Sequence, residues 1–257
     1  MFCLLVPLFL QSGYDMHHFY VAQGPEGGVI RLTDAERVHR LRDVLRLSAG
    51  EEVTVFDGIG HISVCIFESM DDREAVLRVK STRTARPAPV RLAVACALPK
   101  ADRMDDVVDK LTQLGVQAIL PMQTERVVVR LDEAGRQARL ERWQRIAISA
   151  AEQSRRDTLP EVSPIADLDE VLARAGAFDL KLVAALSPGA VNLKDALAGG
   201  HPKSVLALVG PEGDFTPDEV AAAVTSRFIP VSLGSRVLRV ETAAVALAGY
   251  VMLSLDE

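Results

Sequence analysis

The sequence predicts an α/β protein, in which a parallel sheet flanked by helices follows a smaller domain built mostly from strands. Two observations support the parallel sheet. From about residue 90, apolar strand-like runs alternate with segments of helical periodicity, and the first run, residues 90–98, is apolar at every position except Arg91, as in strands buried on both faces. A third observation supports the smaller domain, because short β-branched runs separated by turn residues dominate the chain before residue 80.

In the smaller domain, strands are predicted for residues 19–21, 29–30, 52–56, 61–67 and 75–79. Asp57-Gly58 is a turn signal between two of them. One helix interrupts the strands, because Thr33 and Glu36 have the spacing of a capping box and apolar residues follow at helical intervals. These features indicate a small β-barrel-like domain.

In the larger domain, strands are predicted for residues 90–98, 118–122, 181–186, 204–209 and 229–233, with helices over residues 105–114, 140–150 and 241–255. Another helix begins at Pro217, because Thr216 and Glu219 form a capping-box pattern around it. Pro87 and Pro89 mark a linker. We therefore assign residues 16–86 to the smaller domain and residues 87–257 to the larger one.

Residues 1–15 stand apart from both domains. Their short apolar run is interrupted by Pro7, is too short to span a bilayer, and lacks the basic region and cleavage site of a signal peptide. We interpret them as a leader outside the folded core, or as the product of an upstream start codon with Met16 as the functional start.

Composition bounds the class of protein. The 257 residues are 49% hydrophobic and 25% charged, which permits a packed core and argues against disorder. The net charge of -6 argues against coating nucleic acid by bulk charge, although a local basic face remains compatible with it. Cys3, Cys65 and Cys96 are isolated, so no metal site or disulfide framework is expected, which is consistent with a cytoplasmic protein.

Two glycine-bearing turns in the last quarter of the chain are the strongest functional signal. Residues 209–215 and 233–243 each follow a predicted strand and lead into a helix, so together they can build one pocket beyond the strand ends. Neither turn has the phosphate-binding P-loop pattern or the dinucleotide fingerprint. Pro211 lacks an N–H group and Glu212 would repel phosphate, so a neutral or cationic ligand is favoured. Alternatively, Glu212 only complements a helix dipole.

The second turn combines Arg236, Arg239 and Glu241 with apolar residues between them. Such a loop can wall an aromatic ring and still face an anionic partner. The alternative is a solvated loop with a surface ion pair, which would contribute little to stability.

The ordered motifs resemble those of the RsmE family of ribosomal RNA methyltransferases, which belong to the SPOUT superfamily. The resemblance covers nearly the whole chain from about Met16 onward. Its motifs are HRLRDVLRLSAG at residues 39–50, Asp57-Gly58 after Phe56, KADRMD at residues 100–105, Lys110, residues 114–116, Pro121, residues 124–126, AEQSRR at residues 151–156, GPEG at residues 210–213, and LGSRVLR at residues 233–239 with residues 241–243.

The resemblance implies an N-terminal PUA-like β-barrel that binds RNA and a C-terminal SPOUT methyltransferase domain with a deep trefoil knot. Nothing in the residue patterns themselves predicts a knot. It also implies a cytoplasmic homodimer that uses S-adenosylmethionine to methylate N3 of a uridine in 16S ribosomal RNA or the 30S subunit, with no metal and no membrane. The chain departs from the usual family pattern at Asp214, at Val240 and at His17-His18.

Residue roles follow from the same resemblance. Arg236 and Arg239 are expected to face RNA phosphate or the uracil oxyanion. Glu241 is a candidate general base or loop organiser, and we favour the organiser, because a carboxylate beside two arginines holds its charge and is a poor base. The expected cofactor contacts are Leu186, Gly210, Pro211, Glu212, Gly213, Leu233, Gly234, Val237, Leu238 and Thr242. The expected RNA contacts are Arg40, Arg42, Arg46, Arg103 and Arg155. The alternatives are a solvated ion pair for Arg103 and Arg155, and an ordinary exposed helix face for the other three.

Two other functions stay open at this point. In the first alternative, the chain transfers the methyl group to a ribose 2′-hydroxyl, as other SPOUT enzymes do. In the second, the chain is a cofactor-binding or RNA-binding assembly factor without catalytic activity.

Overall fold

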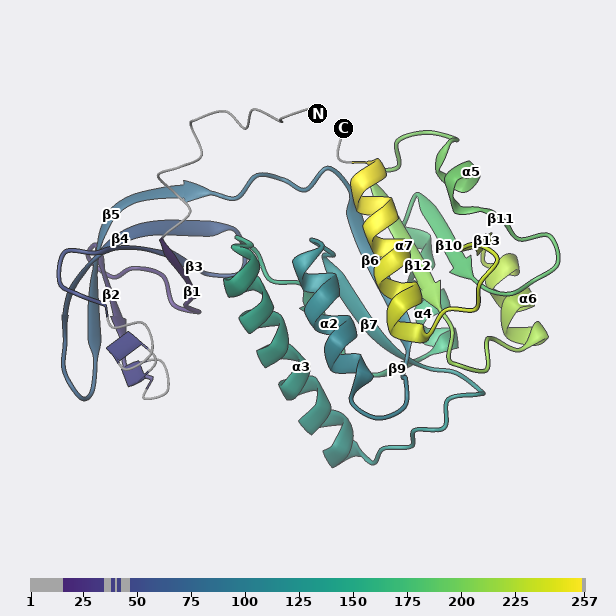
Figure 1. The fold of residues 1–257 in the computed structure, drawn as a ribbon, viewed down its shortest axis with the longest axis horizontal. Helices are drawn as coiled ribbons and strands as arrows, with labels where there is room; N and C mark the ends of the chain where they lie inside the picture. The colour runs from purple at the N-terminus through teal and green to yellow at the C-terminus, as the bar shows by residue number, and fades with distance from the viewer. Residues whose placement is uncertain (1–15, 35–37, 40, 43–46, 256–257) are drawn as a thin grey trace, which may run out of the picture. The chain divides into compact units, whose positions relative to one another are not determined.

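The protein, in a computed structural model that describes residues 16–34, 38–39, 41–42 and 47–255, divides into two compact units between Arg86 and Pro87 (Figure 1). Each unit has a hydrophobic core of its own. The units are therefore described separately.

The first unit is a five-stranded sheet. Its strands are β1 (His17–Tyr20), β2 (Val29–Leu32), β3 (Glu52–Phe56), β4 (His61–Met70) and β5 (Ala75–Thr84), in the order β1-β3-β4-β5-β2. β1 runs parallel to β3, and the other pairs are antiparallel. The predicted strands are confirmed. The helix predicted after Thr33 lies largely outside the described residues, although Val38 and Leu41, which the structure describes, are buried.

The second unit contains an eight-stranded sheet. Its strands are β6 (Arg91–Ala97), β7 (Ala118–Gln123), β8 (Glu161–Val162), β9 (Ala166–Asp167), β10 (Leu180–Ala184), β11 (Val191–Asn192), β12 (Ser204–Val209) and β13 (Ile229–Ser232). The order is β11-β13-β10-β12-β6-β7-β8, β9 also pairs with β7, and every pairing is parallel. The predicted parallel α/β sheet is confirmed. The trefoil knot stays a prediction.

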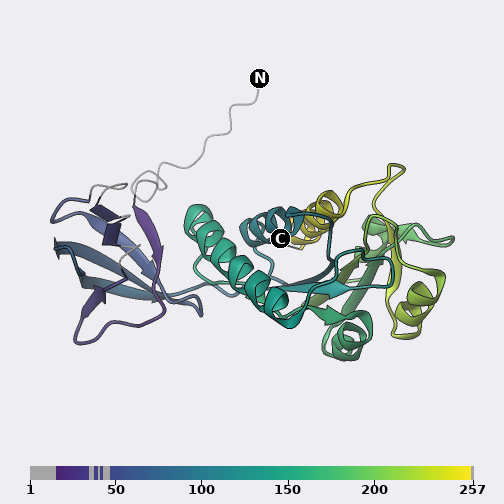
Figure 2. The ribbon, with the colours of Figure 1, turned by 90° about the horizontal axis from the view of Figure 1, so that it is seen from below.

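Helices cover both faces of this sheet. They are α2 (Arg103–Gln113), α3 (Glu133–Ser154), α4 (Leu168–Arg174), α5 (Leu193–Leu197), α6 (Pro217–Thr225) and α7 (Val240–Ser254), with a 3-10 turn η3 (Ala175–Ala177). Figures 1 and 2 show α2, α3 and α7 on one face and α4 and α6 on the other. The central strands β6 and β12 are almost wholly buried between these layers, which explains their continuous apolar runs.

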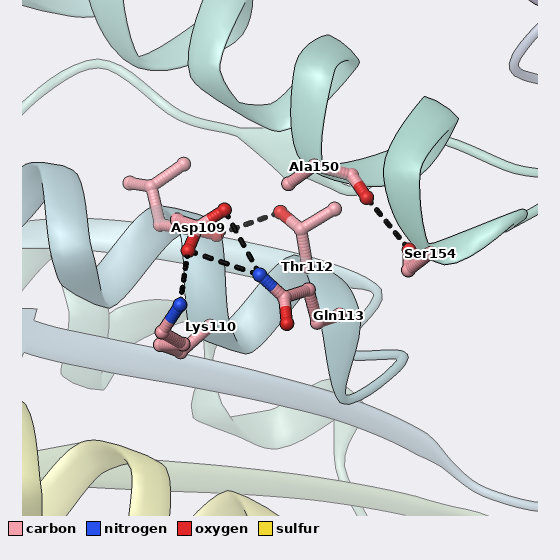
Figure 3. Close-up of polar contacts among 7 residues, drawn as sticks. Asp109, Lys110, Thr112, Gln113, Ala150 and Ser154 are labelled. Atoms are coloured by element: carbon pink, nitrogen blue, oxygen red, sulfur yellow. Dashed lines mark hydrogen bonds and ion pairs between the residues drawn. The ribbon is translucent and has the colours of Figure 1, made fainter.

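Helix α2 shows how the helical layer is built. Val107, Val108 and Leu111 are buried on its inner face. On its outer face, Asp109 accepts hydrogen bonds from Gln113, one turn later, at 3.0 Å and from Lys110 at 2.6 Å (Figure 3). These exposed pairs add little to stability and keep the outer face soluble.

The start of α2 is tied to α3. Asp105 accepts a hydrogen bond at 3.2 Å from the indole N–H of the buried Trp143 and pairs with Arg142, and Asp102 pairs with Arg139 at 3.0 Å. At the other end, the Arg156 guanidinium donates to the Thr112 carbonyl at 3.0 Å, and its burial lowers the pKa of Arg156 to about 10. Helix α2 is therefore held at both ends.

The prediction was incomplete where elements are short. The strand expected over residues 181–186 ends at Ala184, which leaves Leu186 in a loop. Five short elements of two to seven residues were not predicted: α4, α5, β8, β9 and β11. Such segments are too short for a hydrophobic period to repeat.

The capping box at the start of α6 has a measurable effect on stability. Thr216 Oγ1 accepts from the Glu219 N–H at 3.2 Å, and Glu219 accepts in return from the Thr216 N–H at 2.8 Å. Thr216→Ala is expected to lower the free energy of unfolding by about 1 kcal/mol, because an N–H of the first turn loses its acceptor. The measurement is urea unfolding followed by circular dichroism. Thr225→Ala, at the exposed end of the same helix, is the control, and equal losses in both variants would contradict the assignment.

Candidate functional site

A pocket lies at the carboxyl ends of three neighbouring strands of the second unit. β10 pairs in parallel with both β12 and β13, so the residues that follow all three strands meet at one edge of the sheet. The pocket encloses about 600 Å³ of space, part of it open to solvent, and the start of α7 closes one side.

The first glycine turn forms the wall that follows β12. A Cβ atom on Gly210 would lie 3.0 Å from two ring carbons of the buried Phe215, so a larger residue would require that ring to shift by a few tenths of an ångström. Arg126, in the loop after β7, donates to the Gly213 carbonyl at 2.6 Å. The turn is therefore held by two contacts: Gly210 packs against the Phe215 ring, and Arg126 donates a hydrogen bond to the Gly213 carbonyl.

Asp214 joins this wall to the next one. Its backbone is in the left-handed region at φ 61°, which Asp tolerates better than most residues. Its carboxylate accepts a hydrogen bond from the Leu186 N–H at 2.8 Å, and Leu186 belongs to the loop after β10. Both residues line the pocket.

The second glycine turn forms the wall between β13 and α7. Gly234 has φ 115°, a conformation that L side chains rarely adopt, and it lines the pocket. Val237 lies in the same loop and is 78% exposed despite being apolar. Arg236 and Arg239 are also exposed, and neither has a hydrogen bond or ion pair with another residue that the structure describes. Both guanidinium groups are thus accessible to an anionic partner.

A three-residue charge cluster connects the two turns with α2. Arg103, the first residue of α2, lies 3.6 Å from a carboxylate oxygen of Glu212 and 3.9 Å from one of Glu241. Glu212 also accepts from the Lys100 N–H at 3.2 Å. Glu212 belongs to the first glycine turn. Glu241 lies at the end of the second glycine turn, where α7 has already begun, and the dipole of α7 favours a negative charge at this end of the helix. Arg103 therefore bridges the two turns electrostatically.

The inner side of this cluster is buried. The Glu241 Oε2 atom is buried and has no hydrogen-bond partner among the described residues. Burial, with smaller contributions from Glu241 and Glu212, raises the pKa of the Cys96 thiol, at the end of β6, to about 12. Cys96 is consequently protonated at neutral pH and does not serve as a nucleophile.

The structure brings most of the predicted cofactor contacts together. The lining residues among them are Leu186, Gly210, Pro211, Glu212, Leu233, Gly234, Val237 and Leu238. Gly213 and Thr242 are next to lining residues and do not line the pocket themselves. Of the predicted catalytic residues, Arg236 lines the pocket. Arg239 and Glu241 do not line it themselves, but they are the chain neighbours of Val240, which lines it. Glu212 does not lie at the start of α6, which begins at Pro217 and is capped by Thr216. It lies instead beside Arg103, the first residue of α2.

The predicted RNA contacts are scattered. Arg40 and Arg46 lie outside the described residues, and Arg42 is exposed and pairs with Asp72 at 2.8 Å. Arg103 belongs to the charge cluster described above. Arg155 is the left-handed residue that ends α3, with φ 56°.

Sequence reasoning missed several residues of the pocket. Ala184, Ala185, Ser232, Val240 and Ala243 line it without any distinctive motif. Asp214 appeared only as a departure from the family pattern, and Arg126 only as part of a motif with no assigned role. A signal for Asp214 exists, since an Asp directly after a glycine turn is a residue suited to a left-handed backbone.

The arrangement fits a small, partly apolar ligand carrying positive charge. Backbone groups of two glycine turns, apolar side chains and two carboxylates converge on it. Among the described residues, no group of three or more His, Cys, Asp or Glu side chains is placed to hold a metal ion. The helices within the described ranges include none with the length and apolar content needed to cross a membrane.

Two protein families match the two units. The RNA methyltransferase domain family matches residues 86–252, well over half of the chain, and the RNA methyltransferase PUA domain family matches residues 32–80. The chain is 33% identical to ribosomal RNA small subunit methyltransferase E of Bacillus subtilis, over 81% of this chain and 84% of that protein. It is 34% identical to the Mycobacterium bovis protein of the same name, over 91% and 90%.

Solved structures agree with these matches. A ribosomal RNA small subunit methyltransferase E from Neisseria gonorrhoeae, bound to S-adenosylmethionine, has a TM-score of 0.82 and 32% identity, covering 93% of this chain and 98% of its own. A putative methyltransferase from Legionella pneumophila, in complex with the same cofactor, has a TM-score of 0.84 and 29% identity, with the same coverage. The resemblance inferred from the motifs is confirmed. The chain belongs to the ribosomal RNA small subunit methyltransferase E family, S-adenosylmethionine-dependent enzymes with a PUA domain and a SPOUT-type methyltransferase domain.

Proposed function

We propose that this enzyme methylates N3 of one uridine in 16S ribosomal RNA, with S-adenosylmethionine bound in the pocket between the two glycine turns. The observation that carries the proposal is the pocket itself, where the predicted cofactor contacts from three separate strands converge. When bound, the cofactor supplies an electrophilic methyl group on a sulfonium sulfur. Leu186, Leu233, Val237 and Leu238 provide apolar walls, and the turns at Gly210 and Gly234 provide backbone groups.

The residues of the pocket act by holding and orienting their ligands. Positioning supplies much of the rate in such a reaction, since no covalent enzyme intermediate is needed. When the bond between N3 and the methyl carbon forms, N3 loses its proton to solvent. Arg236 and Arg239 lie at the pocket rim and are suited to RNA phosphate or to the negative charge that develops on the uracil oxygens as that proton leaves. Glu241 organises the loop through Arg103, which keeps its carboxylate paired. Gly213 helps to position the first glycine turn, because Arg126 donates a hydrogen bond to its carbonyl. Thr242 helps to position the start of α7 beside the cofactor.

The target base must be reached outside a regular helix. N3 of uracil lies on the edge used for base pairing, so the uridine has to be unpaired or turned out of its stack. The PUA unit, with Arg42 and the segment that contains Arg40 and Arg46, is proposed to bind the surrounding RNA or the 30S subunit, together with Arg155. Such a substrate places the enzyme in the cytoplasm.

We propose further that the enzyme is a homodimer joined through α7. This helix carries a single charged residue, Glu241, and is apolar on nearly every side. One side packs on β6, β12 and α2, while Tyr250 and Leu253 remain 39% and 76% exposed. A helix that is apolar all round is normally buried all round, and a second copy of the same helix would cover the exposed side.

The reaction is tested by supplying methyl-labelled cofactor with 30S subunits or naked 16S RNA that lack the modification. The label is expected in 3-methyluridine after digestion to nucleosides, as identified by chromatography and mass spectrometry. Label in a 2′-O-methylated nucleoside would contradict the base specificity. Cofactor binding without any labelled RNA would contradict catalysis and favour an assembly factor.

Arg239→Ala is expected to lower kcat/KM by about a hundredfold or more, because the developing negative charge loses a positioned cation. Cofactor affinity and unfolding should change little, since Arg239 is exposed and does not line the pocket. Arg174→Ala, at the end of α4, is the matched control and should retain full activity. Full activity in Arg239→Ala would remove Arg239 from the site.

Leu253→Glu is expected to shift the enzyme from dimer to monomer, because it places a charge on the exposed apolar side of α7. Light scattering coupled to size-exclusion chromatography at micromolar concentration measures the change. Val224→Glu alters an exposed apolar residue on α6 and should leave the dimer intact. A wild-type protein that is monomeric under these conditions would overturn the proposal.

A further inference from the structure

One acidic residue of the pocket, Asp214, connects the loop after β12 with the loop after β10. It lies directly after the first glycine turn, and its own N–H donates to the Pro211 carbonyl at 2.9 Å, which closes the turn. One carboxylate oxygen accepts from the Leu186 N–H and the other from the Phe215 N–H, both at 2.8 Å. These bonds fix where the carboxylate sits relative to the pocket, and the side chain is only partly exposed.

The charge of Asp214 is not balanced by a neighbouring side chain. Within the part of the chain that the structure describes, no Lys, Arg or His nitrogen lies within 4.0 Å of its carboxylate. Arg126, which approaches the same turn, donates to the carbonyls of Gly213 and Phe215. The two hydrogen bonds to the carboxylate come from neutral backbone N–H groups, so they leave its formal charge in place.

The other charged groups around the pocket do not offset it. Glu212 also lines the pocket, and among the residues that the structure describes it shares the cation Arg103 with Glu241. Arg236 lines the pocket from the exposed loop after β13, where water screens its charge. The inner wall therefore carries more carboxylate than cationic charge, and it is complementary to a ligand with a positive centre.

We propose that Asp214 is a specificity-determining residue that shifts the preference of the pocket toward the cationic sulfonium donor and away from the neutral thioether left after transfer. This inference rests on the proposed function. When the bond from sulfur to the methyl carbon breaks, its electron pair stays on sulfur, so S-adenosylmethionine becomes the uncharged sulfur compound S-adenosylhomocysteine. The two ligands differ in little else, and an unbalanced carboxylate in a partly shielded pocket distinguishes them by charge.

The same charge would assist turnover. Once the methyl group has left, the attraction between the carboxylate and the sulfur centre disappears, which weakens retention of the spent cofactor. Asp214 would thereby reduce product inhibition without contacting the reacting atoms.

The experiment compares Asp214→Asn and Asp214→Gly with the wild type by isothermal titration calorimetry, using S-adenosylmethionine and S-adenosylhomocysteine separately. Asn keeps one oxygen, which can accept from the Leu186 N–H, and removes the charge together with the acceptor for the Phe215 N–H. We expect its affinity for S-adenosylmethionine to fall about three- to tenfold, with less than a twofold change for S-adenosylhomocysteine. The ratio of the two affinities is the decisive quantity.

Asp214→Gly removes both the charge and the hydrogen bond to Leu186, so comparison with Asp214→Asn separates the two effects. Glycine adopts the left-handed backbone at this position without strain, so the turn should still fold, but the Leu186 N–H loses its acceptor. Both ligands are expected to bind more weakly, and the affinity ratio should fall as in Asp214→Asn. Asp218→Asn, an exposed residue in the first turn of α6 that does not line the pocket, is the control and should leave the ratio unchanged.

The outcomes are distinguishable. An unchanged affinity ratio in Asp214→Asn would overturn the inference, and so would an equal loss for both ligands, which would make Asp214 a purely structural tether. A wild-type protein that binds neither ligand would instead overturn the proposed function. Higher salt should reduce the difference between wild type and Asp214→Asn, because the interaction is electrostatic.

Discussion

The parallel pairing of β10 with β12 on one side and β13 on the other is the constraint on which the site depends. In parallel strands all carboxyl ends point the same way, so the loops that leave three neighbouring strands must meet at one edge of the sheet. Leu186, Gly210 and Leu233 come from separate parts of the chain and meet for this reason. An antiparallel arrangement would send alternate loops to opposite edges, and the pocket would not form.

The loops at that edge are then held to one another by a small number of polar contacts. Asp214 ties the loop after β12 to the loop after β10, Arg126 holds the carbonyl of Gly213, and Arg103 attracts carboxylates from both glycine turns. Each contact pairs a backbone group or a charge of one loop with a partner from another segment, which favours one arrangement of the loops. The pocket is thus largely preformed, which reduces the ordering cost of binding.

The sequence was most informative where a local pattern is sufficient. Continuous apolar runs identified β6 and β12, and the capping box located the start of α6 at Pro217, because these signals depend only on neighbouring residues. Elements of two to seven residues, such as β11 and α5, escaped because their pattern does not repeat. Arg103 was expected to contact RNA, and only the fold revealed its proximity to Glu212 and Glu241, which are more than a hundred residues away in the chain.

The sequence by itself determined the α/β class, the family and the two glycine turns, because those properties depend on composition, periodicity and ordered motifs. The tertiary structure alone decided which side chains share the pocket. Asp214 is the clearest case: its sequence context indicates only a turn, whereas its contact with Leu186 depends on β10 lying beside β12. Contacts between distant segments arise from strand order, and strand order cannot be read from local residue patterns.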